Sequence, residues 1–384
     1  MALIQAKEPK KNVNLRTAQL VQLLTEIGPD IPEISRRLGQ FKESVRYRYK
    51  EKILNRGMVV QAVADHERLG LKRVIAVVEF SPEFNTYAPT ILTAMSDLCY
   101  VTSFAKTLPG SRFVVEASVP YEHIKTFVDF MGLMKEKGLF TFVDVMPYDW
   151  MRWSPMKADY YDFDSGQWDF DWTNSSPGNY QAALYAYSPS MKTKFDYVDL
   201  MIIKELQKDA NISLKEISDK LSINYKKLAW HYGTHVLANR MIDSYRINWM
   251  GTAYNFESEK AMHRKHRYVS INLFVKNVTN VERLTLMQNV NQLPFVWAEA
   301  SGTNYFADLS FPVENVTEAL EYIEKIIAPV RDRAEFFIMD VTNSLSFVIG
   351  YKLFNQESKQ WTFNMNELTE RFENLIAKIR EGVS

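Results

Sequence analysis

Apolar residues recur at helical spacing in two widely separated parts of the chain. The residues on one face are Leu15, Leu20, Leu23 and Leu24 in the first part, and Val198, Leu200, Ile202, Ile203 and Leu206 in the second. Each pattern is followed by a break, a short amphipathic helix, a tight turn, a longer basic helix and an alternating apolar run. This order predicts one winged helix-turn-helix unit at 14–65 and another at 196–252.

Runs rich in β-branched and aromatic residues follow each unit and predict strands separated by helices. The expected strands are Val74–Phe80, Val101–Lys106, Arg112–Val119 and Phe140–Met146 in the first half, and Tyr268–Val275, Phe295–Ala300, Tyr305–Phe311 and Glu335–Val341 in the second. With its two helices, each half has the β-α-β-β-α-β order of a ferredoxin-like domain. We therefore predict an α+β fold in internal duplication, with ferredoxin-like domains at 70–150 and 265–354.

Two segments lie outside this repeat. Residues 151–195 form a linker in which Asp159–Pro189 contains five aspartates, nine aromatic residues and no Lys or Arg. We expect its aromatic side chains to pack on a domain surface; the alternative is an acidic strip that covers a basic DNA-reading face. Residues 364–384 carry an amphipathic pattern that predicts a C-terminal helix at Asn366–Glu381.

The third helix of each unit is the candidate DNA-reading helix. Such a helix presents its early residues to the major groove, and its Lys and Arg side chains neutralise phosphates. The side chains expected to face DNA are Lys42, Glu43, Arg46, Tyr47 and Lys50 in the first unit, and Tyr225, Lys226, Lys227, Trp230 and His231 in the second. A basic helix can also be an ordinary solvated face, but two such helices at the same place in one pattern favour DNA binding.

Composition narrows the possible classes of protein. Lys+Arg and Asp+Glu both number 46, so the net charge is zero, which excludes a uniformly basic surface but not local basic faces. The single cysteine, Cys99, allows no intramolecular disulfide and no multi-cysteine metal site. The sequence has no signal-peptide pattern and no apolar run long enough to span a membrane. We therefore expect a cytoplasmic protein without membrane contact.

Familiar catalytic motifs are absent from the sequence: there is no P-loop, nucleotide-binding glycine fingerprint, His-Glu-x-x-His or Gly-x-Ser-x-Gly. We accordingly expect no catalytic residues, no cofactor and no enzyme activity. His231 and His235 stand four residues apart, a spacing that can bind zinc on a helix. Because no cysteine or acidic residue stands near them in the sequence, we expect a packed or DNA-facing pair and no metal.

At this point the sequence resembles a known family. The stretch Asp196–Ile223 (DYVDLMIIKELQKDANISLKEISDKLSI) is similar to the helix-turn-helix of the Lrp/AsnC (feast/famine) transcriptional regulators, and Phe295–Ile326 is similar to their ferredoxin-like effector domain. The first half resembles them more weakly, at Arg56–Val59 and His66–Leu71. The chain thus looks like a tandem duplicated member of that family.

The resemblance implies a regulator that binds double-stranded DNA, with its two effector-type domains paired sheet to sheet as a pseudo-dimer within one chain. It also implies a small-molecule effector at the glycine turns, where the candidate residues are Gly110, Ser111, Gly302, Thr303 and Asn304. The acidic residue that often follows this glycine in the family is missing from both turns, which puts amino-acid sensing in doubt. A homodimer is left open.

Two alternatives to the regulator remain. Sirohaem decarboxylases resemble the same family and use His and Arg residues around a tetrapyrrole, so His66 with Arg68, or His263 with Arg264, are candidates here. The Arg-rich, Gly-Ala-containing stretch of those enzymes is absent, because Gly57 is followed by Met-Val-Val-Gln. The third interpretation is a scaffold whose helix-turn-helix units bind proteins.

Overall fold

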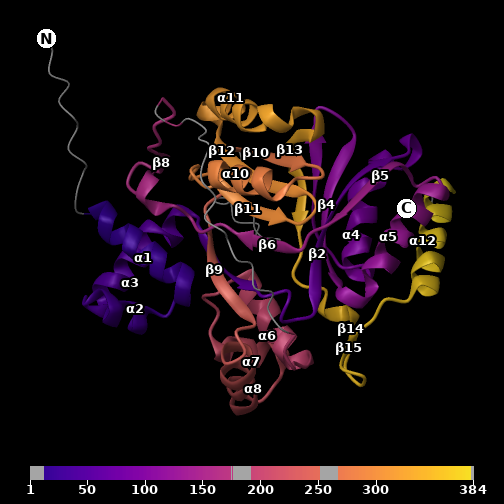
Figure 1. Cartoon of the computed structure of the whole chain (residues 1–384). Coiled ribbons are helices and arrows are strands. Elements are labelled where there is room, and N and C mark those ends of the chain that lie inside the picture. The colour runs from indigo at the N-terminus through magenta and orange to yellow at the C-terminus, as the bar shows by residue number, and fades with distance from the viewer. Residues whose placement is uncertain (1–12, 174, 176–191, 251–266, 382–384) are drawn as a thin grey trace, which may run out of the picture.

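The structure is a computed structural model that describes residues 13–173, 175, 192–250 and 267–381 (Figure 1). His263 and Arg264, the second pair of candidate tetrapyrrole residues, lie outside the described residues. None of the described helices is long and apolar enough to cross a membrane.

Each half of the chain begins with three helices. These are α1 (Val13–Ile27), α2 (Ile31–Leu38) and α3 (Lys42–Lys52) in the first half, and α6 (Tyr197–Lys208), α7 (Leu214–Leu221) and α8 (Tyr225–His231) in the second. Gly39 and Ser222 follow the middle helices with left-handed φ angles of 61° and 53°, which ends each helix in a sharp turn. A capping box between Ser213 and Glu216 starts α7. Both predicted helix-turn-helix units are therefore present.

The third helix of the second unit differs from the expected α-helix that continues to Asn239. The α-helical part ends at His231, and a π-helical segment, η5 (Tyr232–Leu237), continues it. In the first unit, α3 is followed only by the short 3-10 helix η1 (Leu54–Arg56). π-Helical turns are rare and often lie at functional sites, so the two reading helices differ in geometry as well as in sequence.

The alternating run after each unit forms a strand, but these strands are not free wings. β1 (Val59–Ala64) and β9 (Ile242–Asn248) pair with each other in antiparallel register, with Val60 opposite Ile247. Every residue of β1 is buried, and so are most of those of β9. The pairing connects the two units to each other and leaves this ribbon unavailable to a DNA groove.

Two ferredoxin-like domains follow the helix-turn-helix units. The elements of the first are β2 (Leu71–Phe80), α4 (Ala88–Leu98), β3 (Val101–Leu108), β4 (Arg112–Pro120), α5 (Ile124–Glu136) and β5 (Phe140–Pro147); those of the second are β10 (Tyr268–Val275), α10 (Asn280–Val290), β11 (Val296–Ser301), β12 (Tyr305–Pro312), α11 (Val316–Ile327) and β13 (Ala334–Ser346). Their strand orders are β5-β2-β4-β3 and β13-β10-β12-β11. The predicted fold class is confirmed.

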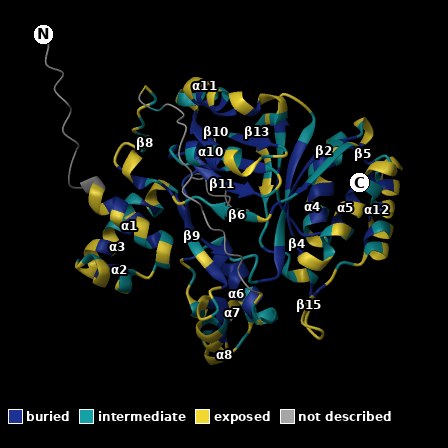
Figure 2. Ribbon diagram, viewed as in Figure 1, coloured by how far each residue is buried: buried dark blue, intermediate teal, exposed yellow. Residues whose placement is uncertain are grey.

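The two domains exchange strands and so form one nine-stranded sheet. β6 (Trp150–Trp153) leaves the first domain and pairs with β11 of the second, while the end of β13 pairs with β3 of the first. The inner faces also pack on each other, since the rings of Tyr148 and Phe306 lie 6.2 Å apart within a buried cluster. Figure 2 shows this buried sheet in the middle of the molecule. The expected sheet-to-sheet pairing is present, with a hydrogen-bonded exchange that the sequence did not predict.

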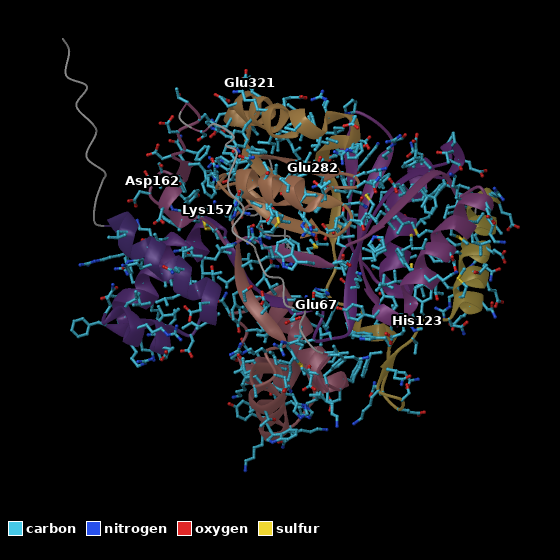
Figure 3. The ribbon with its side chains drawn as sticks, viewed as in Figure 1. Glu67, His123, Lys157, Asp162, Glu282 and Glu321 are labelled. Carbon is cyan, nitrogen blue, oxygen red and sulfur yellow. The ribbon has the colours of Figure 1, made fainter. Side chains whose placement is uncertain are left out.

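In the described part of the linker, Trp168, Phe170 and Trp172 pack against the second ferredoxin-like domain, as expected. The linker forms a hairpin of β7 (Tyr161–Asp162) and β8 (Gln167–Trp168) beside the first helix-turn-helix unit, where Figure 3 labels Asp162. Trp168 lies 5.3 Å from Phe295, and Trp172 stacks on the same ring at 5.6 Å. Asp164 pairs with Lys52 at the end of α3. Residues 174 and 176–191 lie outside the described part, so a covering role for that portion stays a prediction.

The C-terminal helix α12 (Met365–Arg380) is present and packs on α5 of the first ferredoxin-like domain. Phe372 lies 5.4 Å from Phe130, and Leu368 and Ile376 are also buried. Before it comes a second hairpin, β14 (Phe354–Asn355) and β15 (Gln360–Trp361), which the sequence analysis missed. The indole of Trp361 donates to the carbonyl of Leu69 at 2.7 Å, which ties this hairpin to the first half.

Candidate functional site

The reading helices present most of the predicted side chains to solvent. Lys42, Glu43, Arg46, Tyr47 and Lys50 on α3, and Tyr225, Lys226, Lys227 and Trp230 on α8, are all exposed. Tyr47 is 69% exposed and Trp230 is 54% exposed, which is unusual for large aromatic side chains. Phe41, just before α3, is 86% exposed and was missed by the sequence analysis. The two helices therefore carry aromatic and cationic groups together on their outer faces.

The cationic side chains on these faces differ in whether a carboxylate pairs with them. Arg46 forms an ion pair with Glu43 on the same helix, so part of its charge is compensated. Lys42, Lys50, Lys226 and Lys227 form no ion pair with any other residue that the structure describes. Those four lysines are the groups on the two helices that are best placed to meet phosphates.

His231 does not face outward, and its assignment to DNA is wrong. It is only 4% exposed, and its Nδ1 atom lies 2.9 Å from Oδ1 of Asp199 on α6. His231 follows the buried Leu228 by three residues, so both side chains lie on the inner face of α8. Helical phase alone could have placed His231 inside the unit.

A cavity lies where the two halves meet. Its walls come from the β1–β2 connection, strands β2, β3, β4, β6, β9, β10, β11, β12 and β13, and α6. The residues with chemistry to offer are His66, Arg73, Glu116, Trp153, Arg246, Trp297 and Asp308. Because both halves supply walls, the cavity depends on the strand exchange. A concave site with a few convergent polar groups is the usual form of a small-molecule site.

Two arginines and two tryptophans form one wall of this cavity. The guanidinium of Arg246 lies 4.3 Å from the ring of Trp153 and 4.9 Å from that of Trp297. The guanidinium of Arg73 lies 5.6 Å from Trp153 and donates to the hydroxyls of Ser118 and Thr102 at 2.8 and 3.1 Å. Flat guanidinium groups stacked on indoles can bind carboxylate oxygens in their own plane.

His66 lies in the same cavity. Burial lowers its pKa well below the ordinary value, and the nearby charge of Arg73 lowers it further. Its Nδ1 atom is buried and has no hydrogen-bond partner among the described residues. A neutral imidazole nitrogen without a hydrogen-bond partner can coordinate a metal ion.

Carboxyl groups also line the cavity. Burial raises the pKa of Asp308 well above its ordinary value, and the Glu116 carboxylate raises it further, while a hydrogen bond from Asn272 at 3.0 Å acts in the opposite direction. The larger effects therefore favour the neutral form of the Asp308 carboxyl. The cavity thus combines two permanent cations, a histidine whose pKa is lowered and an acid whose pKa is raised.

The predicted effector residues do not come together at this cavity. Gly110 and Ser111 form the turn between β3 and β4, where the Ser111 hydroxyl donates to Glu79 at 2.8 Å. Gly302, Thr303 and Asn304 form the corresponding turn between β11 and β12, held by a bond from the amide of Val278 to the Thr303 carbonyl. Neither turn lines the cavity between the halves.

Of the first pair of tetrapyrrole candidates, one residue lines the cavity. His66 lines the cavity, but Arg68 does not, because its guanidinium pairs with Asp65 at 3.1 Å. Arg73 and Arg246 line the cavity instead, and neither was predicted from the sequence. Arg73 directly precedes the predicted strand Val74–Phe80 and Arg246 is in the other half of the chain, so only the folded sheet brings them to His66.

Comparison with known proteins gives a partial family match and a full-length fold match. Residues 195–233 match the family of winged helix-turn-helix DNA-binding domains. No curated protein matches the chain. The crystal structure of the siroheme decarboxylase NirDL is similar over 92% of this chain and 98% of its own, with 12% identity and a TM-score of 0.53.

Two further structures resemble the chain. The same siroheme decarboxylase in complex with an iron-uroporphyrin III analogue covers 96% of this chain and 99% of its own, with 9% identity and a TM-score of 0.51. The transcriptional regulatory protein PF0864 from Pyrococcus furiosus, a member of the AsnC family, covers 35% of this chain and 87% of its own, with 19% identity and a TM-score of 0.27.

The expectation that the chain is not an enzyme is contradicted by this comparison. The solved structures that match nearly the whole chain are those of an enzyme, the siroheme decarboxylase. At 12% and 9% identity the match establishes the fold. The chain therefore contains a winged helix-turn-helix of the DNA-binding type within a full-length fold that is also the fold of a decarboxylase.

Proposed function

We propose that this chain is a duplicated, Lrp/AsnC-like regulator that binds double-stranded DNA through α3 and α8. The observation that carries the proposal is the exposure of aromatic and unpaired lysine side chains on both third helices, at Tyr47 and Trp230 and at the four lysines named above. Exposed apolar groups rimmed by polar and charged side chains are typical of interaction surfaces. The match of 195–233 to DNA-binding domains supports DNA as that partner.

The two reading helices favour an asymmetric target. α3 carries Lys42 and Lys50, whereas α8 carries Lys226 and Lys227 together at its start. The pairing of β1 with β9 fixes the two units relative to each other, so the spacing between half-sites follows from one rigid geometry. A target with two unlike half-sites is expected.

Binding of the purified chain to labelled random duplex DNA, followed by fluorescence anisotropy at ~50 to ~200 mM salt, tests this proposal. We expect log K to fall with log[salt] with a slope of about −4 or steeper, because about four or more phosphates are neutralised. Absence of binding at the lowest salt would contradict the proposal. Binding to a protein partner with little salt dependence would favour the scaffold instead.

A second function is favoured by the cavity between the halves. We propose that it binds an anionic tetrapyrrole, as in a siroheme-decarboxylase-like enzyme. Arg73 and Arg246 would hold the carboxylates of the macrocycle, Trp153 and Trp297 would supply flat apolar surface, and His66 would supply a nitrogen to a central iron. This cavity, and not the glycine turns, is then the place for a small molecule.

The acid of the cavity suits a decarboxylation. Loss of CO₂ from a carboxylate breaks a carbon–carbon bond and leaves the electron pair on carbon, which must then take up a proton. Asp308 would be the donor of that proton, because burial and the Glu116 carboxylate raise its pKa. The arginines would hold the carboxylate groups that are not lost.

Titration of the purified chain with iron uroporphyrin III, followed by visible absorption, tests the second function. Arg73→Gln should weaken binding by about tenfold or more, since a hydrogen bond to a charged group contributes about 1.5–3 kcal/mol. His66→Phe should alter the absorption spectrum of the bound complex more than its affinity. Arg371→Gln, on the exposed surface of α12, is the control. Equal affinities for the Arg73 and Arg371 variants would remove the cavity from consideration as the tetrapyrrole site.

A further inference from the structure

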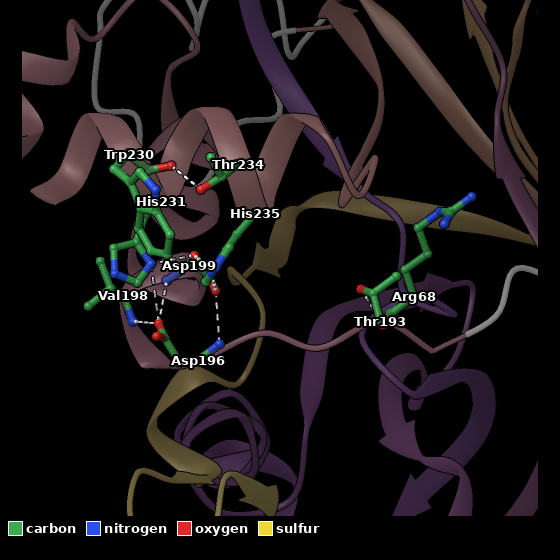
Figure 4. A network of polar contacts seen from close by, with 9 residues as sticks. All are labelled: Arg68, Thr193, Asp196, Val198, Asp199, Trp230, His231, Thr234 and His235. Atoms are coloured by element: carbon green, nitrogen blue, oxygen red, sulfur yellow. Dashed lines mark hydrogen bonds and ion pairs between the residues drawn. The ribbon is translucent and has the colours of Figure 1, made fainter.

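We propose that Asp196, Asp199, His231 and His235 form a binding site for a divalent transition metal, with zinc as the best match. Each residue offers one ligand atom, and these four atoms all lie within 4.8 Å of one another. Figure 4 shows the four side chains converging between α6 and the third helix of the second unit. The expectation from sequence that no acid lies near the histidines is wrong, because the fold brings α6 against them.

Local structure explains why the four side chains meet. Asp196 caps α6 and accepts from the amides of Val198 and Asp199, while Asp199 accepts from the amide of Asp196. This capping box points both carboxylates toward the start of α6. His231 ends α8 and His235 lies one turn later in η5, so both rings face α6. The cluster therefore joins the first and third helices of one helix-turn-helix unit.

Both histidines direct the same kind of atom at the same carboxylate. Nδ1 of His231 lies 2.9 Å from Oδ1 of Asp199, and Nδ1 of His235 lies 3.0 Å from Oδ2. Nδ1 of His231 is also 3.7 Å from Oδ1 of Asp196. Two imidazole nitrogens and two carboxylate oxygens are a four-coordinate ligand set that zinc accepts. A metal ion would replace the protons that now form the hydrogen bonds between the imidazoles and the carboxylate.

Charge and burial favour a cation at this point. The side chains of Asp199 and His231 are 0% and 5% exposed, whereas those of Asp196 and His235 are 32% and 28% exposed, so the site has an inner pair and an outer pair of ligands. Within the described ranges, no Lys or Arg pairs with either aspartate. A buried carboxylate without a permanent cation is costly. The ring of Trp230 covers the two imidazoles at 5.1 and 4.7 Å.

The first helix-turn-helix unit has no counterpart of this site. When Val45 and Leu228, the buried residues of the two third helices, are matched, Arg48 and Lys52 stand where His231 and His235 stand in the second unit. Arg48 donates to Gln40, and Lys52 pairs with Asp164. The metal site is therefore specific to the second unit.

The test uses the full chain, stripped with a chelator, and Co²⁺ as a spectroscopic probe for Zn²⁺. We expect one Co²⁺ per chain with the strong visible absorption of a four-coordinate site, displacement of Co²⁺ by Zn²⁺, and a melting temperature that rises with Zn²⁺ concentration. Asp196→Asn keeps the helix cap, because asparagine caps as well as aspartate does. Asp196→Asn removes the charge of one ligand, and His235→Asn removes one imidazole ligand.

Each of these two variants should lower Co²⁺ affinity by at least about tenfold, since loss of even a supporting partner has that effect. His123→Asn, on the first ferredoxin-like domain (Figure 3), is the matched control and should bind as the unmodified chain does. Unchanged thermal unfolding of both variants without metal would show that they fold. Stoichiometric binding that persists in Asp196→Asn and His235→Asn, or no binding by the unmodified chain, would overturn the proposal.

Discussion

Replacing Lys42, Lys50, Lys226 and Lys227 together by alanine should lower the affinity for random duplex DNA on the order of a thousandfold at ~0.15 M salt. All four lysines are exposed on α3 and α8, and none is paired with a carboxylate of another described residue. Each lost phosphate contact removes about 0.9 from the negative slope of log K against log[salt]. The slope measured by fluorescence anisotropy should therefore become shallower by about 3 to 4.

A control variant loses the same number of positive charges on other surfaces of the chain. Lys125, Lys135, Lys325 and Lys378 are exposed on the helices of the ferredoxin-like domains and on α12. Their replacement by alanine changes the net charge equally but should leave the slope nearly unchanged. If the two quadruple variants weaken binding to the same extent, the effect comes from total charge and the reading helices are not the DNA-binding surface.

Replacing Arg152 by methionine should lower the free energy of unfolding by about 3 kcal/mol, because it leaves the buried carboxylate of Glu299 without its cation. Glu299 on β11 is 0% exposed at its side chain and accepts from Arg152 at 2.7 and 3.2 Å. Tyr305 and Asn291 also donate to it, at 2.7 and 3.2 Å. The loss should be measured by urea denaturation followed by circular dichroism.

Two further variants test whether the loss of stability comes from the unpaired charge of Glu299. Arg371→Met breaks an exposed pair with Glu367 and should change stability by less than about 0.5 kcal/mol. Adding Glu299→Gln to Arg152→Met removes the unpaired charge and should restore most of the loss. Equal losses for Arg152→Met and Arg371→Met would mean that the pair between β6 and β11 does not hold the two halves together.

The elements of this fold were predictable wherever local chemistry decides them. Ser213 and Glu216 mark the start of α7, and alternation of β-branched residues marks the strands. The π-helical segment after His231 has no local signal in the sequence. The inward direction of His231 did have a local signal, because His231 follows the buried Leu228 by three residues.

The sites were less predictable because long-range pairing builds them. His66, Arg73 and Arg246 reach one cavity only after β1 pairs with β9 and the two sheets exchange strands. Asp199 reaches His231 through the packing of two helices that are separated by a third. Exposure of the reading lysines, by contrast, follows from helix periodicity alone.

The exchange of β6 and the end of β13 has a kinetic consequence. Pairs such as Trp153 with Ala298 and Leu108 with Ile338 join residues from opposite halves of the chain. Closing such long loops must precede any gain from the contacts, so the sheet should form slowly compared with the local helical units. During synthesis, one edge of β3 stays unpaired until β13 has left the ribosome. The nascent chain is thus exposed to aggregation for longer than its small domains would suggest.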